Sequence, residues 1–483
     1  MTHSSSKAKS AQFDPLIKKI ADYVFDYKVV DPAALLAAHY CLIDSLGCAF
    51  DARQHSDCNA LIGPTVKGTL VPLGSRVPGT HWQLDPVEAA FSTSTLIRWL
   101  DFNDAFYGKT VIHPSDCLGA LISVADHQSR LRRSQHLKPY TLKDLYICII
   151  KAYEIMGGLA IDQEWTAKLG LDHVLLIKIG ATALCTLLMG GNRQELMNGI
   201  SNAWIDAQTL ALFRRGDAAG ARKSWAAGDA AARGVWLAWA SLRGEMGYPT
   251  ALSAQHWGFE SIHLKGQTLS LKTSLSHNVI DNVQFKLSYP AGLHAQSAAE
   301  AAITAHPFVC NKITDIARIT VHTHRYALSI LNRIGPLKHF AERDHCLQYI
   351  IAIGLLYGRL QSSDYLEPIA LDPRIDALRS ITDLVESTDY TQAFYDPEKK
   401  ANANRIQITF KDGSQSAVYE VLYPIGHPKR RKEGLPLLQR KFNKNTKNLF
   451  PQKQAQTIID LSENFTTLQS LAVDEFLTLL SID

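Results

Sequence analysis

The sequence predicts a mainly α-helical protein, in which a large all-helical domain built from both chain ends carries a smaller central α+β domain. Three observations lead to this prediction. From about Asp14 to Tyr248, apolar residues recur at helical spacing. After Gln267 the pattern alternates in two places, as strands do, and near the C-terminus the helical spacing returns. We therefore expect a helical domain at 1–275, an α+β domain at 276–427, and a segment at 428–483 that rejoins the helical domain.

The helices expected in the first part are rich in alanine and leucine, and Gly, Asp or Ser punctuates their ends. Many are apolar on nearly all sides, which predicts helices buried inside a large bundle. A Gly/Pro-rich segment at 67–78, which is not expected to be helical, interrupts this series of helices. The main segments are Ala34–Cys48, Val87–Leu100, Cys117–His127, Leu142–Gly157, Leu175–Gly190, Arg193–Leu210 and Ala226–Arg243.

The central part mixes strands and helices. Alternation predicts a strand at Ile316–His324 and a hairpin at Asn404–Tyr423, whose turn is Lys411-Asp-Gly413. Helices are expected between them, at about Gln296–Ala305 and Asp344–Gly358. A final helical stretch is expected at Gln452–Leu480.

The composition argues against several classes of protein. The net charge is only +4, and the basic stretch Pro428–Lys447 contains scattered apolar residues, so we expect a solvated connector there and no nucleic-acid site. Met1–Phe13 lacks the apolar core of a signal peptide, and no run reaches the roughly 18 apolar residues of a membrane span. The eight cysteines form no CxxC pair, so we expect reduced thiols in a soluble cytoplasmic protein.

The chemistry-bearing residues collect where apolar helices begin. His113 lies in a loop just before the helix expected at Cys117–His127, with Ser115 or Asp116 as its N-cap. His173, after the natural N-cap Asp172, opens the next such helix. Lys223 stands at a small-residue helix start, and Arg214 and Arg215 lie in the loop before it. Lys286 and His294 lead into the helix at Ala295–Ala305.

Cations at helix N-termini suit a ligand with several carboxylates, if these segments converge. The helix dipole also disfavours protonation of His113 and His173, which keeps an imidazole available as a base. The alternative for each residue is helix-end solvation or a surface ion pair. No HExxH, P-loop, GxSxG or iron–sulfur ligand pattern appears, so no metal and no cofactor are expected.

The same segments resemble the MmgE/PrpD family, from about Phe13 to the C-terminus and without large gaps. The resemblance implies a two-domain, usually dimeric enzyme whose central α+β domain is a lid, with metal-free chemistry on a tricarboxylate. The motifs that carry it are Arg98-Trp-Leu-Asp-Phe-Asn-Asp104, His113-Pro-Ser-Asp116, Gly170-Leu-Asp-His-Val-Leu-Leu176, Arg222-Lys-Ser-Trp-Ala-Ala-Gly-Asp-Ala230, Gly244-Glu-Met-Gly-Tyr-Pro249, Phe285-Lys-Leu-Ser-Tyr-Pro-Ala291, Arg343-Asp-His-Cys-Leu-Gln-Tyr349 and Tyr423-Pro-Ile-Gly-His-Pro428.

Within this family the motifs are most similar to members that remove water from 2-methylcitrate in propionate catabolism. The resemblance implies that Asp101, His113, His173, Lys223 and Lys286 lie in the active site, with a looser match at His294. Our hypothesis is that His113 and His173 are base and acid, in either order, and that Asp101 orients an imidazole or lysine. Lys223 and Lys286 would bind carboxylates and stabilise developing charge, and Arg214, Arg215 and His294 are further candidates for substrate binding. Decarboxylation of cis-aconitate is the alternative, but a threonine of the decarboxylase corresponds to Ala105 here. A non-catalytic helical binding protein is the other alternative.

Overall fold

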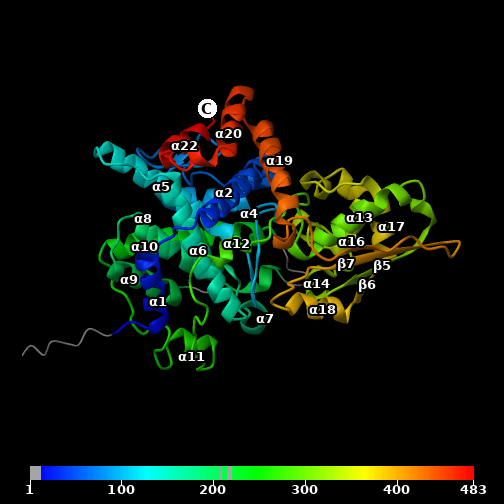
Figure 1. Cartoon of the computed structure of the whole chain (residues 1–483), viewed down its shortest axis with the longest axis horizontal. Coiled ribbons are helices and arrows are strands. Elements are labelled where there is room, and N and C mark those ends of the chain that lie inside the picture. Colours follow the sequence, from blue (N-terminus) through cyan, green and yellow to red (C-terminus); the bar gives the residue numbers. More distant parts are fainter. Residues whose placement is uncertain (1–11, 207–208, 215–219, 483) are drawn as a thin grey trace, which may run out of the picture.

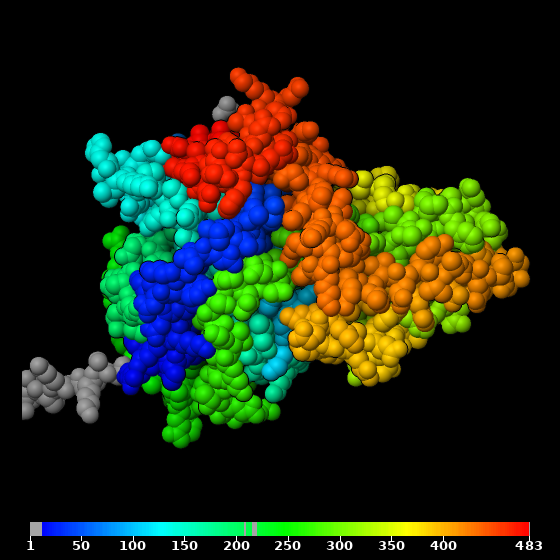
Figure 2. Space-filling view, viewed as in Figure 1, coloured from blue at the N-terminus to red at the C-terminus, as the bar shows by residue number. Residues whose placement is uncertain are grey.

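A computed structural model describes residues 12–206, 209–214 and 220–482 of the chain. Figure 1 shows two lobes, a larger one of packed helices and a smaller one that contains a β-sheet. The mainly α-helical fold predicted from the sequence is confirmed. In Figure 2 the orange segment at 431–449, which follows the small lobe, covers the junction between the two lobes on this face.

The helical lobe is built around helix α10 (Arg222–Leu242), which packs against α4 (Pro86–Arg98) and α8 (Val174–Leu188). Gly228 permits the close approach to α4, because a Cβ atom there would collide with the Phe91 carbonyl and the Thr95 hydroxyl. The other elements are α1 (Pro15–Asp26), α2 (Pro32–Ala52), α3 (Ser56–Leu61), α5 (Leu118–Ser134), α6 (Leu142–Asp162), α7 (Thr166–Leu169), α9 (Arg193–Ile205), α11 (Phe259–His263), α12 (Asn278–Asp281), and the short hairpins β1 (Ser75–Arg76)–β2 (Gln83–Leu84) and β3 (Phe106–Tyr107)–β4 (Val111–Ile112).

The small lobe has a four-stranded sheet in the order β6-β5-β7-β8. β5 (Ile316–Thr323) pairs in parallel with β6 (Thr382–Glu386) and antiparallel with β7 (Asn404–Phe410), which forms the predicted hairpin with β8 (Tyr419–Val421). Figure 1 shows helices α13, α16 and α17 on one side of the sheet and α18 on the other. The helices of this lobe are α13 (Gln296–Val309), α14 (Arg325–Leu331), α15 (Phe340–Arg343), α16 (Leu347–Tyr357), α17 (Pro373–Ser380) and α18 (Thr388–Tyr395).

The C-terminal segment packs on the helical lobe. Helix α19 (Arg431–Leu449) lies against α2, and α22 (Val473–Leu479) lies against α5. The expectation of a solvated connector at Pro428–Lys447 was wrong, because Leu438, Lys441 and Phe442 are buried at helical spacing. The stretch expected as one helix is divided into α20 (Gln452–Glu463), α21 (Phe465–Leu468) and α22.

Some predicted boundaries also differ. Ser115 and Asp116 do not cap α5, because Pro114–Cys117 forms a 3₁₀ turn in which both side chains turn inward to buried polar partners. Helix α9 ends at Ile205, short of Leu210. His324 is not a strand residue; its ring instead accepts a hydrogen bond from the Ala327 amide at the start of α14.

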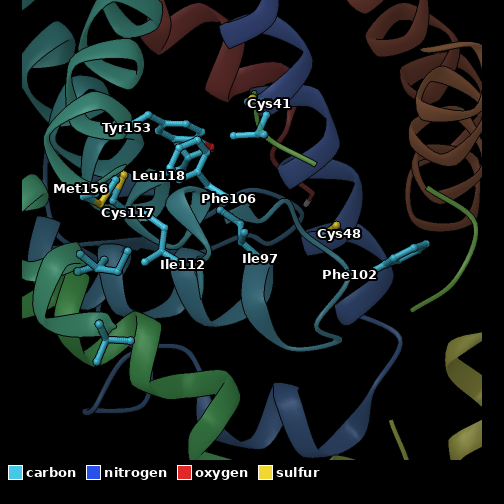
Figure 3. Packing of buried hydrophobic residues seen from close by; sticks show 14 of the residues in the cluster. Cys41, Cys48, Ile97, Phe102, Phe106, Ile112, Cys117, Leu118, Tyr153 and Met156 are labelled. Atoms are coloured by element: carbon cyan, nitrogen blue, oxygen red, sulfur yellow. The ribbon is translucent and has the colours of Figure 1, made fainter. Parts of the chain in front are cut away.

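The core of the helical lobe is apolar and contains most of the cysteines. Figure 3 shows part of it, where Cys41, Cys117 and Tyr153 lie among side chains from several helices. All eight cysteines are free thiols, and only Cys310 is exposed. Within the described residues, α2 alone is long and apolar enough to cross a membrane, but 78% of that window is buried inside the protein, as in a core helix.

Candidate active site

A cavity of about 80 Å³ lies where the two lobes meet, and both lobes contribute to its wall. From the helical lobe come Asp101, His113 and His173, and from the small lobe come His294 and His345. The cavity is narrow, with room for a few water molecules.

Asp101 is the electrostatic centre of this site. It follows α4 with a left-handed φ of 48°, and its carboxylate accepts hydrogen bonds from Arg98 and Lys286. The His345 Nε2 atom lies 3.2 Å from Asp101 Oδ2, and His113 Nε2 lies 3.9 Å from Oδ1. Burial alone raises the pKa of Asp101, but Arg98 and Lys286 outweigh it and hold the pKa well below its usual value. Asp101 is therefore ionised.

His113 is held in one tautomer. Its Nδ1 lies 2.7 Å from the Asp104 carbonyl oxygen, which can only accept, so Nδ1 carries the proton. In the neutral ring the lone pair is then on Nε2, the atom nearer to Asp101. Burial lowers the pKa of His113 well below its usual value, and the neighbouring Arg98 and Lys286 lower it further. This imidazole is neutral and has a free basic nitrogen.

His173 has the opposite surroundings, although its ring centroid lies only 5.4 Å from that of His113. Its Nε2 lies 3.3 Å from Asp116, and its Nδ1 lies 3.3 Å from Asp172. The contact with Asp116 has hydrogen-bond geometry and a carboxylate can only accept, so Nε2 carries a proton. His173 is placed to be a proton donor where His113 is placed to be a proton acceptor.

Lys223, in the first turn of α10, reaches across to the small lobe. Its ammonium donates to the Asp344 carboxylate and lies 2.9 Å from Nδ1 of His345. His345 therefore connects Lys223 with Asp101. Burial lowers the pKa of Lys223, and Asp344 partly offsets this effect. This ammonium is buried, with 2% of the residue exposed.

The other predicted cations are also near the cavity. The Arg214 guanidinium forms a two-pronged contact with Asp172, with Nε 2.6 Å from Oδ2 and Nη2 3.2 Å from Oδ1. Lys286 is completely buried and donates to both the carboxylate and the carbonyl of Asp101. Arg215 lies outside the described residues.

His294 lies at the other end of the cavity, among aromatic side chains. Its ring centroid is 5.0 Å from that of Tyr326 and 5.5 Å from that of Phe394, and its Nδ1 lies 3.4 Å from the Asn402 amide oxygen. Burial lowers the pKa of His294 well below its usual value, and the neighbouring His324 lowers it further. His294 is therefore a neutral polar group at an otherwise apolar wall.

The cations of the site are each matched by a carboxylate of the protein. Arg98 and Lys286 contact Asp101, and the same relation holds for Arg214 with Asp172 and Lys223 with Asp344. A polycarboxylate ligand must therefore share these cations with the carboxylates of the protein. Among the described residues, no group of three His, Cys, Asp or Glu side chains is arranged to hold a metal ion.

Two family models together cover most of the chain: the MmgE/PrpD N-terminal domain matches residues 18–272 and the MmgE/PrpD C-terminal domain matches residues 289–467. The chain belongs to the MmgE/PrpD family. It is 44% identical to a 2-methylcitrate dehydratase of Salmonella typhimurium over 97% of each chain, and 43% identical to one of Cupriavidus necator over the full length of both. A mitochondrial 2-methylcitrate dehydratase of Yarrowia lipolytica is 41% identical over 96% of this chain and 90% of its own.

Sequence reasoning missed several groups of this MmgE/PrpD site. Arg98 and Asp116 were inside quoted motifs, yet nothing local indicated that they face Asp101 and His173. Asp344 and His345 belong to the Arg343-Asp-His motif, but they lie in the other lobe. An Asp-His pair directly before an apolar helix was the signal that could have pointed to them.

Proposed function

We propose that this protein is a hydro-lyase that removes water from 2-methylcitrate to give 2-methyl-cis-aconitate in propionate catabolism. The observation that carries this proposal is the pairing of two neighbouring imidazoles with opposite hydrogen-bond surroundings, His113 and His173. Dehydration needs one group that takes a proton and one that gives a proton to the leaving hydroxyl. Relatives that are 41–44% identical over at least 90% of their length carry this activity in their names.

In the proposed mechanism, His113 Nε2 takes the proton alpha to a substrate carboxylate. His173 gives a proton to the tertiary hydroxyl, the C–O bond breaks, and water leaves as the C=C bond forms. The two histidines end with exchanged protonation states, which solvent resets. General acid–base groups contribute on the order of a hundredfold to ten-thousandfold each, so both groups matter to the rate.

The cations around Asp101 and Asp344 support this chemistry. The carbanion formed next to a carboxylate spreads its charge onto that carboxylate, and buried cations stabilise such charge strongly. Lys223 and Lys286 are buried behind the cavity wall, where they contact its lining residues His345 and Asp101, and we assign them to the substrate carboxylates. Arg214 and His294 line the cavity and are assigned to the edges of the site. Asp101 holds Lys286, His345 and His113 in their relative positions.

We propose further that the central part predicted at 276–427, apart from α12, which packs on α6 and α2, acts as a lid over a helical body made of 1–275 and 428–483. This is supported by the cavity, whose wall comes from both lobes. Opening admits the substrate, and closure excludes water and brings Asp344 and His345 to Lys223.

The absorbance of the conjugated alkene acid, followed after adding 2-methylcitrate, tests this function. We expect the absorbance to rise, to keep rising in the presence of a chelator, and to stay flat for Lys223→Ala. The control is Lys444→Ala, on the exposed side of α19, which should behave as the wild type. A flat trace for folded wild-type protein would refute dehydration, and carbon dioxide released from cis-aconitate would then indicate decarboxylation.

We propose that this protein acts as a soluble cytoplasmic homodimer. Trp236 and Trp239 on the outer face of α10 are 45% and 41% exposed, with ring centroids 4.9 Å apart. Leu210 and Leu212, 64% and 69% exposed, line a groove beside the same helix. Apolar side chains clustered on one face are typical of protein interfaces, and a second copy of the chain would cover them.

A further inference from the structure

Lys441 is a buried lysine that no part of the proposed chemistry uses. It lies in the middle of α19, in the C-terminal segment, and 4% of its side chain is exposed. Its ammonium donates three hydrogen bonds: to the Asp44 carboxylate at 2.8 Å, to the Phe102 carbonyl at 2.8 Å and to the Lys286 carbonyl at 2.9 Å. An ammonium has three N–H donors, so all of them are used.

The two carbonyls that Lys441 binds belong to the backbone segments that carry the centre of the site. Phe102 directly follows Asp101, and the other carbonyl is that of Lys286 itself. On the cavity side, the Lys286 side chain donates to Asp101, both to its carboxylate and to its carbonyl at 2.7 Å. The Lys441 ammonium thus bridges the backbones of the two segments, while the side chains of Lys286 and Asp101 contact each other on the cavity side.

The geometry points to Lys441, with its counterion Asp44, as a positioning residue for the Asp101–Lys286 pair. It thereby positions His113 and His345, whose Nε2 atoms lie 3.9 Å and 3.2 Å from the Asp101 carboxylate. The inference rests on the dehydration proposed above. In this role the C-terminal segment supports the active site without contributing a catalytic group, because Lys441 belongs neither to the segment of Asp101 nor to that of Lys286.

Further contacts fix where this ammonium lies. It is 3.7 Å from the centroid of the Phe102 ring, a cation–π contact with the same residue whose carbonyl it binds. In Figure 3 the Phe102 side chain projects away from the other labelled residues. Burial alone would lower the pKa of Lys441, but Asp44 outweighs it and raises the pKa, so the lysine stays charged.

A buried ion pair adds little to the stability of the fold, because apolar residues of similar volume often stabilise a protein as well or better. A pair at this place offers something that apolar side chains do not: directional bonds to two carbonyls that must keep a set separation. A misplacement of about 1 Å at a reacting centre can cost a hundredfold in rate. We therefore expect loss of Lys441 to affect turnover more than substrate binding.

The experiment compares Lys441→Met, Lys441→Arg and the double variant Asp44→Asn/Lys441→Met with a control, Lys444→Met. Lys444 lies one turn further along α19 and is exposed. The double variant removes both charges, so no uncompensated buried carboxylate disturbs folding. Steady-state kinetics with 2-methylcitrate gives kcat and KM, and hydrogen exchange followed by mass spectrometry reports on the peptides that contain 101–104 and 284–287.

We expect kcat of the folded double variant to fall on the order of tenfold to a hundredfold, with KM little changed and faster amide exchange in both peptides. Lys441→Arg, which keeps a charged donor, should recover part of kcat, and Lys444→Met should match the wild type. An unchanged kcat in the double variant, or equal losses in kcat and in affinity without faster exchange, would overturn the inference. Inactive wild-type protein would refute the proposed function instead, and the exchange data would still decide whether Lys441 positions these segments.

Discussion

The substitution His113→Gln tests the assignment of the base most directly. A glutamine amide can still donate to the Asp104 carbonyl that His113 Nδ1 binds at 2.7 Å, so the local hydrogen bond is replaced. It offers no basic nitrogen at the position of Nε2. The neighbouring imidazole of His173, whose ring centroid is 5.4 Å away, hydrogen-bonds through Nε2 to the Asp116 carboxylate, so it is placed as a proton donor and not as a substitute base.

The expected loss follows from these contacts. Removal of a general base costs on the order of a hundredfold to ten-thousandfold in kcat, which corresponds to about 3–5 kcal/mol in the activation free energy. KM should change little, because His113 is assigned to proton transfer. The matched control is His127→Gln, since His127 Nδ1 also bonds a backbone carbonyl, that of Leu73 at 2.8 Å, but lies outside the cavity.

Two measurements check this prediction. Steady-state kinetics gives kcat, and proton NMR in D₂O follows exchange of the substrate proton alpha to the carboxylate. Both dehydration and exchange should be lost in His113→Gln and kept in His127→Gln. If His113→Gln keeps wild-type exchange, or loses less than tenfold in kcat, the base is another group and the tautomer argument fails.

The remaining predictions concern charge, pH and assembly. Asp101→Asn should lower kcat at least as much as Lys223→Ala, because it leaves the buried Lys286 ammonium without its counterion. Kinetics of both variants at saturating substrate will check this, and a larger loss of kcat in Lys223→Ala would contradict it. Acid should destabilise the protein through His39, because burial lowers the pKa of this imidazole from 6.5 to about 4. Between these two pH values the unfolded state binds a proton at His39 and the native state does not. The free energy of unfolding therefore falls as the pH drops through this window, by up to about 3 kcal/mol. Urea unfolding at pH 7 and pH 5 should therefore show a smaller difference in His39→Gln, and an unaltered difference would contradict this assignment. Trp236→Ser/Trp239→Ser should sediment as a monomer while Trp257→Ser, at an 84% exposed tryptophan outside α10, sediments as the wild type; a dimeric double variant would place the interface elsewhere.

Local pattern was sufficient for much of the fold. The hairpin turn at Lys411-Asp-Gly413 and the buried helices α8 and α10 follow from spacing and composition, because these signals act between residues close in sequence. The local sequence pattern gave wrong predictions where the burial of a residue depended on partners distant in sequence. Helix α19 looked like a solvated connector because its charges are frequent, yet Lys441 is buried against Asp44, nearly four hundred residues earlier.

The sequence by itself determined which kinds of residue stand at helix starts, and so which groups were candidates: His113, His173 and Lys223 all lie on the cavity or reach its lining residues. Only the tertiary structure decided what each one does. The Asp104 carbonyl sets the tautomer of His113, two carboxylates flank His173, and Asp344 and His345 come from the other lobe. The physical reason is that protonation depends on the charges and acceptors within a few ångströms of a ring, and folding brings these from segments that no local pattern connects.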